Sequence, residues 1–217
     1  MFENIFGTHQ RSTLIDAAFD DISSMLQQSY EMMKLSVPAL LDNRPLEVDI
    51  DSMDDRVDEG ERMVRRTVLE HLSVNPHRDL VVSLVLVSMV QDAERVGDFS
   101  NGILKLTSMA KSPRQGPFAD RLRKIASRIE PLFSQCEEAF REGDAEKAKE
   151  LIATHRELRN ALQRYTQEVA DSDLSADMAV VYSSAASMLR RISAHLSNIA
   201  SSVVQPYDRI RHGDEDA

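Results

Sequence analysis

The chain has 217 residues, of which 42% are hydrophobic, and a formal net charge of −10 at pH 7. Non-specific nucleic-acid binding needs a basic face, so this acidic balance argues against it. The single cysteine, Cys136, excludes an intramolecular disulfide and indicates a reducing compartment.

Apolar residues with helical spacing, interrupted by turn-forming residues, predict three helices in the first half of the chain. Their expected ranges are roughly Gln10–Leu41, Leu46–Leu72 and His77–Ala110. Pro45, Pro76 and Pro113 follow the three ends and favour a break there. The segment 112–117 contains two Pro and one Gly, and we interpret it as a linker.

Three more helices are expected after the linker, at roughly Phe118–Arg141, Ala145–Ala170 and Leu174–Gln205. Pro131 predicts a kink in the fourth helix. Gly143 and Asp144 indicate a turn followed by a helix N-cap. The polar residues 213–217 predict a disordered tail.

Long amphipathic helices with short connections form antiparallel neighbours, and the sequence shows no competing strand pattern. We therefore expect an all-α protein built from two tandem three-helix bundles: a first repeat at 1–112, a second at 118–206 and a polar tail at 207–217. Asn101-Gly102-Ile103 and Asn198-Ile199-Ala200 lie 97 residues apart near the ends of the third and sixth helices, which indicates an internal duplication.

Acidic residues on the second helix recur with spacings of 4, 3, 4 and 3 and therefore share one face. They are Glu47, Asp51, Asp54, Asp58 and Glu61. A second stripe beside them is apolar and consists of Ile50, Met53, Val57 and Val64. The second helix is thus expected to bury one stripe and to present carboxylates along the other.

A stripe on the third helix changes from apolar to polar without losing its helical register. It consists of Leu84, Val87, Gln91, Glu94, Asp98 and Asn101. Glu94 and Asp98 lie one turn apart, where like charges repel, and a bound cation is one physical reason to keep them together. If both stripes line one groove, their carboxylates suit hard cations and also iron or manganese. The alternative is a solvated acidic face neutralised by Arg56, Arg62, Arg65, Arg66 and Arg95.

The third-helix segment Glu94-Arg95-Val96-Gly97-Asp98 closely resembles the signature of the PhoU family of phosphate-transport regulators. The preceding residues follow the family's order: Asp54, Val57, Asp58 and Glu61, then Pro76, then Asp79-Leu80. The resemblance is strong over residues 54–101, and the six-helix plan extends it to the whole chain. It implies two three-helix bundles, multinuclear metal clusters at the acidic motifs, and a role in phosphate uptake and its signalling. The metal ligands it implies are Glu94 and Asp98, then Asp58, Asp54 and Glu61, with iron, manganese or zinc as the metal.

The partners that the resemblance implies are a phosphate transporter, of the ABC or sodium–phosphate type, or a phosphate-sensing histidine kinase. Residues 1–10 lack the pattern of a signal peptide, and the apolar run 80–90 is too short to cross a bilayer. We therefore expect a cytoplasmic protein that reaches the inner membrane only through its transporter. Whether it forms a homodimer is left open.

The second half departs from the family's acidic motif. With a repeat of 97 residues, positions 94 and 98 correspond to Arg191 and His195, and the acidic positions of the second helix correspond to His155 and Arg159. Arginine cannot ligate a metal, so a second cluster is not expected. One interpretation is loss of the site, with the arginines in ordinary ion pairs. The other is a cationic groove, which would also include Arg190 and would bind phosphate or an acidic partner surface.

No catalytic motif for a nucleophile, a phosphate-binding loop or a kinase is present, and we expect no enzymatic activity. Two alternatives stay open. One is a carboxylate bundle that stores iron or uses it for redox chemistry, against which the absence of a His ligand beside the acids argues. The other is a helical adaptor that binds no metal.

Overall fold

The computed structural model describes residues 12–46, 48–110 and 114–210. Its long helices are α1 (Thr13–Asp42), α2 (Ile50–Val74), α3 (Leu80–Lys105), α4 (Pro117–Glu142), α5 (Ala145–Ala170) and α6 (Ala176–Val204). Short 3-10 turns, η1 (Leu106–Met109) and η2 (Tyr207–Arg209), follow α3 and α6. These ranges contain no strand, so the all-α prediction is confirmed. Glu47, Ser112, Pro113 and the predicted disordered tail lie outside the described residues.

Side-chain caps set several of the helix boundaries. Ser12, Asp49 and Asp144 each accept a hydrogen bond from backbone N–H groups in the first turn of α1, α2 and α5, respectively. Gly143 ends α4 in the left-handed conformation, with φ of 71°, which glycine adopts without steric cost. Pro131 lies inside α4, and this helix continues through it to Glu142.

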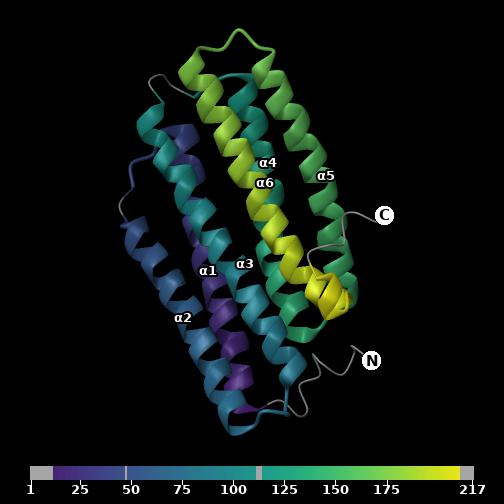
Figure 1. Ribbon diagram of the computed structural model, residues 1–217. Coiled ribbons are helices and arrows are strands. Elements are labelled where there is room, and N and C mark those ends of the chain that lie inside the picture. The colour runs from purple at the N-terminus through teal and green to yellow at the C-terminus, as the bar shows by residue number, and fades with distance from the viewer. Residues whose placement is uncertain (1–11, 47, 111–113, 211–217) are drawn as a thin grey trace.

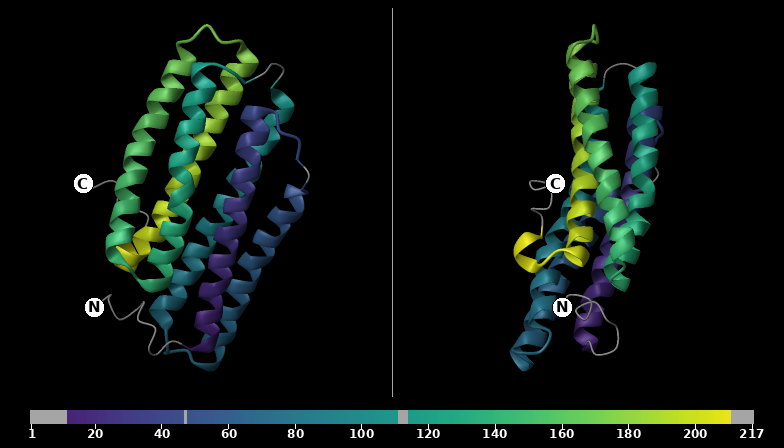
Figure 2. Two further views of the ribbon diagram at one scale, coloured as in Figure 1. Left: turned by 180° about the vertical axis from the view of Figure 1, so that it is seen from behind. Right: turned by 90° about the vertical axis from the view of Figure 1, so that its right-hand side faces the viewer.

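The six long helices pack as two three-helix bundles side by side. In the first, α1, α2 and α3 contact one another, and in the second α4, α5 and α6 do so. Contacts between α3 and α6 and between α1 and α4 join the bundles, so α2 and α5 lie at opposite edges (Figure 1). Seen edge-on, the assembly is narrow (Figure 2). The inner helices consequently bury most of the apolar surface, including Ile22, Met32 and Leu86.

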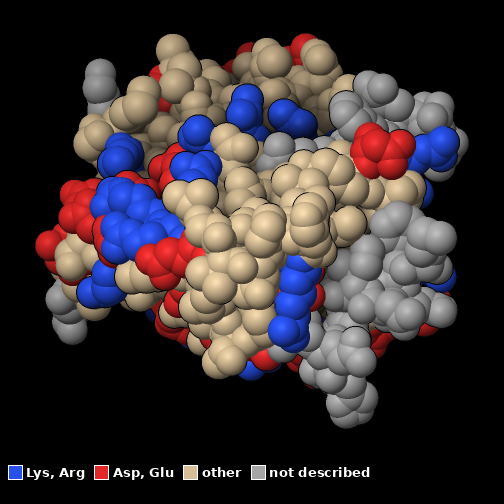
Figure 3. Space-filling model, turned by 60° about the horizontal axis from the view of Figure 1, so that its bottom comes forward, with Lys and Arg blue, Asp and Glu red and all other residues tan. Residues whose placement is uncertain are grey.

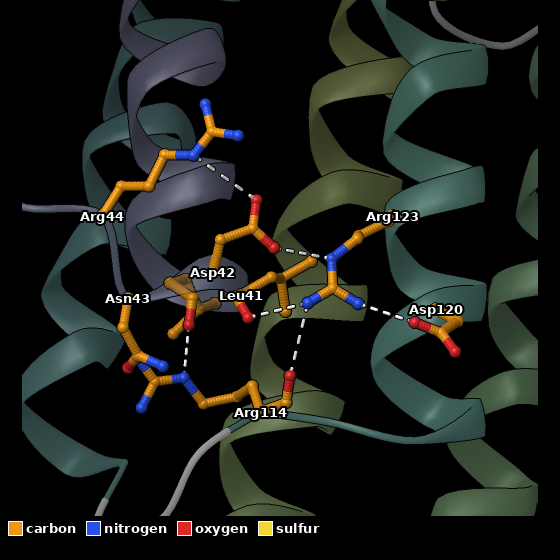
Figure 4. Close-up of polar contacts among 8 residues, drawn as sticks. Leu41, Asp42, Asn43, Arg44, Arg114, Asp120 and Arg123 are labelled. Atoms are coloured by element: carbon orange, nitrogen blue, oxygen red, sulfur yellow. Dashed lines mark hydrogen bonds and ion pairs between the residues drawn. The ribbon is translucent and has the colours of Figure 1, made fainter.

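Two arginines connect the end of α1 to the start of the second repeat (Figure 4). Buried Arg114 donates hydrogen bonds to the backbone oxygen of Leu40 and to Oδ1 of Asn43. Arg123 donates to the backbone oxygen of Leu41 at 2.8 Å and pairs with Asp42 at 2.7 Å. The last carbonyls of a helix lack intrahelical hydrogen bonds and carry the negative end of its dipole. The guanidinium groups of Arg114 and Arg123 supply both the missing hydrogen bonds and a favourable positive charge.

None of the described helices is long and apolar enough to cross a membrane.

Candidate functional site

The acidic stripes of α2 and α3 lie next to each other where these two helices pack, close enough for the charge of Glu61 to act on Glu94 and that of Asp98 to act on Asp54, and we call this acidic seam the acidic groove. The carboxylates implied as ligands are all half-buried: Asp54, Asp58, Glu61, Glu94 and Asp98. The other acidic side chains of the middle of α2, such as Asp55 and Glu59, are exposed. The apolar stripe predicted beside them, which includes Val57, is buried. The helical register therefore separates carboxylates inside the groove from those in open solvent.

Asn101 joins the two stripes at one end of the groove. Its Nδ2 donates to Oδ2 of Asp54 at 2.7 Å and to Oδ1 of Asp51 at 3.2 Å. The residue itself is buried, with 1% of its surface exposed. This amide therefore fixes the start of α2 against the end of α3 and orients the Asp54 carboxylate.

Gly97 allows α3 to approach its neighbours closely beneath the acidic pair. A Cβ atom at this position would lie 3.1 Å from Cγ1 of Val57 on α2 and 3.2 Å from Oγ of Ser29 on α1. Contacts this short require the neighbouring atoms to move. Because Gly97 stands between Glu94 and Asp98 in sequence, the close approach brings both carboxylates against α2.

The groove makes ionisation of its central carboxyl groups unfavourable. Burial, followed by the charges of Asp98 and Glu61, raises the pKa of Glu94 to about 7, although Arg95 acts in the opposite direction. Oε2 of Glu94 is buried and accepts no hydrogen bond from the described residues, although Nε of Arg95 forms an ion pair with it at 3.4 Å. Burial also raises the pKa of Asp54. A cation bound here would reduce the repulsion between the carboxylates and would interact with the Glu94 oxygen that accepts no hydrogen bond.

Arginines at the rim of the groove neutralise several of these acids. Arg95 pairs with Asp98 at 2.8 Å, and Arg65 pairs with Glu61 at 2.8 Å. In this arrangement no group of three or more His, Cys, Asp or Glu side chains among the described residues is gathered around a metal position. The donor set suits an oxygen-preferring cation in kind. Binding would require the carboxylates to turn from these exposed arginines, whose ion pairs contribute little stability.

The second repeat makes a contact that corresponds to the one between Val57 and Gly97. Nδ1 of His155 on α5 lies 3.0 Å from Oγ of Ser193 on α6. The Ser193 hydroxyl donates to the backbone oxygen of Arg190, so its oxygen accepts from the His155 ring. His155 is only 3% exposed and fills the space between the helices rather than facing a groove.

This contact fixes which residues of the two repeats are equivalent. Glu61 lies four residues after Val57, as Arg159 lies four after His155. Glu94 lies three residues before Gly97, as Arg190 lies three before Ser193. Glu61 and Glu94 of the first repeat are thus replaced by Arg159 and Arg190, which line the corresponding groove between α5 and α6.

The groove predicted from His155, Arg159, Arg191 and His195 is not assembled as such. Arg191 extends over the ring of Phe99 on α3, with 5.3 Å from its guanidinium carbon to the ring centroid. His195 also faces α3 rather than α5. The assumed repeat of 97 residues was one too long in α6, and one residue rotates a helical position by about 100°. Arg190, not Arg191, therefore lies opposite Arg159.

A comparison with protein families matches the PhoU domain to residues 22–107 and again to residues 122–203. The chain belongs to the PhoU family. The two PhoU segments end 96 residues apart, which is the separation of Gly97 and Ser193. The internal duplication and the family resemblance are therefore both supported by a repeated match.

Solved PhoU structures share the fold. The phosphate transport system regulatory protein PhoU from Streptococcus pneumoniae aligns with a TM-score of 0.76 and 17% identity, over 92% of this chain and 96% of that chain. PhoU from Pseudomonas aeruginosa aligns with a TM-score of 0.77 and 20% identity, over 94% of this chain and all of that chain. No curated protein matches the sequence.

Sequence reasoning did not find Asp92, the buried carboxylate that joins the PhoU repeats. It is 2% exposed and accepts hydrogen bonds from two residues of α6, His195 at 2.8 Å and Asn198 at 2.9 Å. A signal was present, because Asp92 occupies the core-facing side of α3 together with Met89 and Val96. A charged residue at a core position is retained only with a partner.

Proposed function

We propose that this protein is a regulator of phosphate uptake that acts by binding a partner protein rather than by catalysis. The observation that carries this proposal is the double match to the PhoU domain, which extends over both halves of the chain. A relative of the same fold is described as a phosphate transport system regulatory protein. The partners would be a phosphate transporter, of the ABC or sodium–phosphate type, or a phosphate-sensing histidine kinase.

An exposed apolar stripe on α3 supports a partner-binding role. Leu80 is 44% exposed, and Leu84 and Val87 are each 39% exposed. Viewed from the end where α2 turns into α3, the molecule presents a central area without charged side chains (Figure 3). Contiguous apolar surface on a protein is typical of an interaction site. The stripe continues in the same register into Glu94 and Asp98. A change in the conformation of the acidic groove would therefore occur next to the surface that contacts the partner.

We further propose that the acidic groove of the first repeat binds iron, manganese or zinc through Glu94, Asp98, Asp58, Asp54 and Glu61. Support comes from the half-buried carboxylates, the raised pKa of Glu94 and its buried oxygen without a hydrogen bond. The metal would supply positive charge that gathers the carboxylates. It would thereby fix the spacing of α2 and α3 next to the apolar stripe.

A metal-free adaptor is the second candidate, because arginines already pair with the groove carboxylates. Elemental analysis of untagged protein from metal-replete cells separates the two. We expect metal in the wild type and its loss from Glu94→Gln/Asp98→Asn. Equal, negligible metal in both proteins, with unchanged partner binding, would establish the adaptor instead.

The regulatory role is tested by phosphate uptake in cells that lack the gene. We expect uptake to continue at high external phosphate, where complemented cells reduce it. Binding is then measured with the purified transporter subunits and with the kinase. Leu84→Asp should weaken the complex at least about tenfold, because it places a charge in the apolar contact. Val180→Asp, at an exposed apolar position of α6, is the matched control. Unchanged uptake in the deletion strain would contradict the role.

A further inference from the structure

The exposed stripe of α3 is part of a wider apolar surface at one end of the first bundle. Val81 is exposed beside Leu80 and Leu84 on the same helix. Tyr207 of η2 is also exposed, and its hydroxyl lies 3.4 Å from the hydroxyl of Ser88, one turn after Leu84. Tyr207 therefore extends the apolar surface beyond α3. We call the following residues the α3 apolar surface: Leu80, Val81, Leu84, Val87 and Tyr207.

The start of α1 lies at the same end of the bundle as this surface (Figure 2). The ring of His71, at the end of α2, is fully buried there. Its Nε2 donates to the backbone oxygen of Arg78 at 3.1 Å, so its Nδ1 accepts from the Ser12 hydroxyl at 3.0 Å. Arg78 stands two residues before Leu80. The chain that precedes Ser12 is thus anchored next to the first turn of α3.

The sequence that precedes this anchor is apolar at its beginning. Four of the residues 1–6 are large and apolar, and their spacing places them on one face of a helix. By contrast, residues 211–217 contain one alanine and are otherwise polar or glycine. Of these two segments outside the described residues, only the first has side chains suited to an apolar surface. These side chains are Met1, Phe2, Ile5 and Phe6.

The connection between this segment and the anchor is long enough for contact with α3. Residues 7–11 span at most about 17 Å when extended, at roughly 3.3–3.6 Å per residue. Leu80 and Val87 lie about 10 Å apart along the axis of α3, and a helix with its side chains has a radius of about 5 Å. Because the connection starts beside Leu80, Phe6 can reach each α3 residue of the surface.

We propose that residues 1–6 dock on the α3 apolar surface of the same chain and cover it when no partner is bound. Removing four apolar side chains and the surface from water favours docking. The short connection also keeps the segment at a high effective concentration near the surface, which favours it over a segment from a second molecule. Ordering the segment costs conformational entropy, so the cover is held weakly enough for a partner to displace it.

Tryptophan fluorescence tests the docking directly, because the chain contains no tryptophan. Phe6→Trp places a single reporter in the segment. Its emission should lie at shorter wavelength, and acrylamide should quench it less, than in a synthetic peptide of residues 1–11 with the same substitution. Adding Leu84→Asp should restore the emission of the free peptide, because a charge replaces an apolar contact. Adding Val180→Asp, at an exposed position of α6, should leave the emission unchanged.

Three outcomes would overturn the proposal. The first is emission from the Phe6→Trp protein that equals that of the peptide. The second is short-wavelength emission that Leu84→Asp does not alter, because the segment would then lie elsewhere. The third is short-wavelength emission that disappears on dilution, which would assign the contact to a second copy of the chain. Circular dichroism checks that each variant is folded, and Leu84→Gln replaces Leu84→Asp if the latter does not fold.

The covering role rests on the proposed function, because it assumes that the partner binds the α3 apolar surface. Deletion of residues 2–6 should raise the affinity for the transporter subunits or the kinase at least about threefold, since no cover has to be displaced. Equal affinities would overturn the covering role. The fluorescence experiment needs no partner. Its failure would therefore leave the proposed role in phosphate uptake standing, and failure of that role would leave the docked segment standing.

Discussion

The ring of His195 lies against the buried carboxylate of Asp92, with Nδ1 and Oδ1 separated by 2.8 Å. An ionised carboxylate only accepts hydrogen bonds, so the ring nitrogen donates. The same ring stacks on Phe99 of α3, with 5.6 Å between the centroids. A residue that the sequence pattern assigned to a cationic groove is thus part of the contact between the repeats.

Replacing Asp92 with Ala should lower the free energy of unfolding by about 2–3 kcal/mol, because His195 and Asn198 lose their shared acceptor inside the protein. Asp92→Asn retains an oxygen acceptor and should cost less. Asp55→Ala, at an exposed acid of α2, should stay within about 0.5 kcal/mol of the wild type. Urea unfolding measures all three, and similar losses for Asp92→Ala and Asp55→Ala would contradict this role.

Gly97→Ala should destabilise the protein by about 1–3 kcal/mol, because the new methyl group meets Val57 and Ser29 in a packed interior. Gly102→Ala is a matched control on the same helix. There the methyl group would meet only the flexible end of Met188, which can move aside. Thermal unfolding should therefore separate the two variants. Equal midpoints would show that the close approach of α3 to α2 is not required.

Arg114→Ala should lower the free energy of unfolding by about 2–4 kcal/mol, since it removes hydrogen bonds from a charged donor and exposes the last carbonyls of α1. Arg44→Ala is a suitable comparison. Its ion pair with Asp42, at 3.8 Å, is at the surface and should matter little. Chemical denaturation of both variants tests the difference, and comparable stabilities would refute it.

Glu94 should make stability depend on pH. Its pKa is raised to about 7 in the folded protein from a usual value of 4.5, so the folded state holds this proton more tightly than the unfolded state does. The resulting stabilisation is complete below the usual value and is lost as pH rises through 7. In chelator, wild type should therefore lose stability relative to Glu94→Gln between pH 5 and pH 8. Denaturation curves that run parallel over this range would rule out the effect.

The helices and the acidic groove could be predicted because both follow from periodicity within a helix. Spacing alone places Glu94 and Asp98 on one face of α3 and the acids of α2 on one face of that helix. Gly97 lies where α3 packs closely against α2. Periodicity does not say which neighbour a face meets. Arg190 and Arg191 differ by one position, yet the first faces α5 and the second α3. The contacts of Arg114 could not be predicted either, because a residue of a linker belongs to no periodic pattern.

The arginine contacts at the end of α1 have a mechanical consequence. A short connection between two bundles is normally the place where a hinge forms. Here Arg114 and Arg123 hold the segment around that connection to α1, and Asp92 ties α3 to α6 farther along. Rotation of one bundle against the other would therefore have to break these contacts. A change that leaves them intact would be small in amplitude, such as the turning of carboxylates between helices that stay in place.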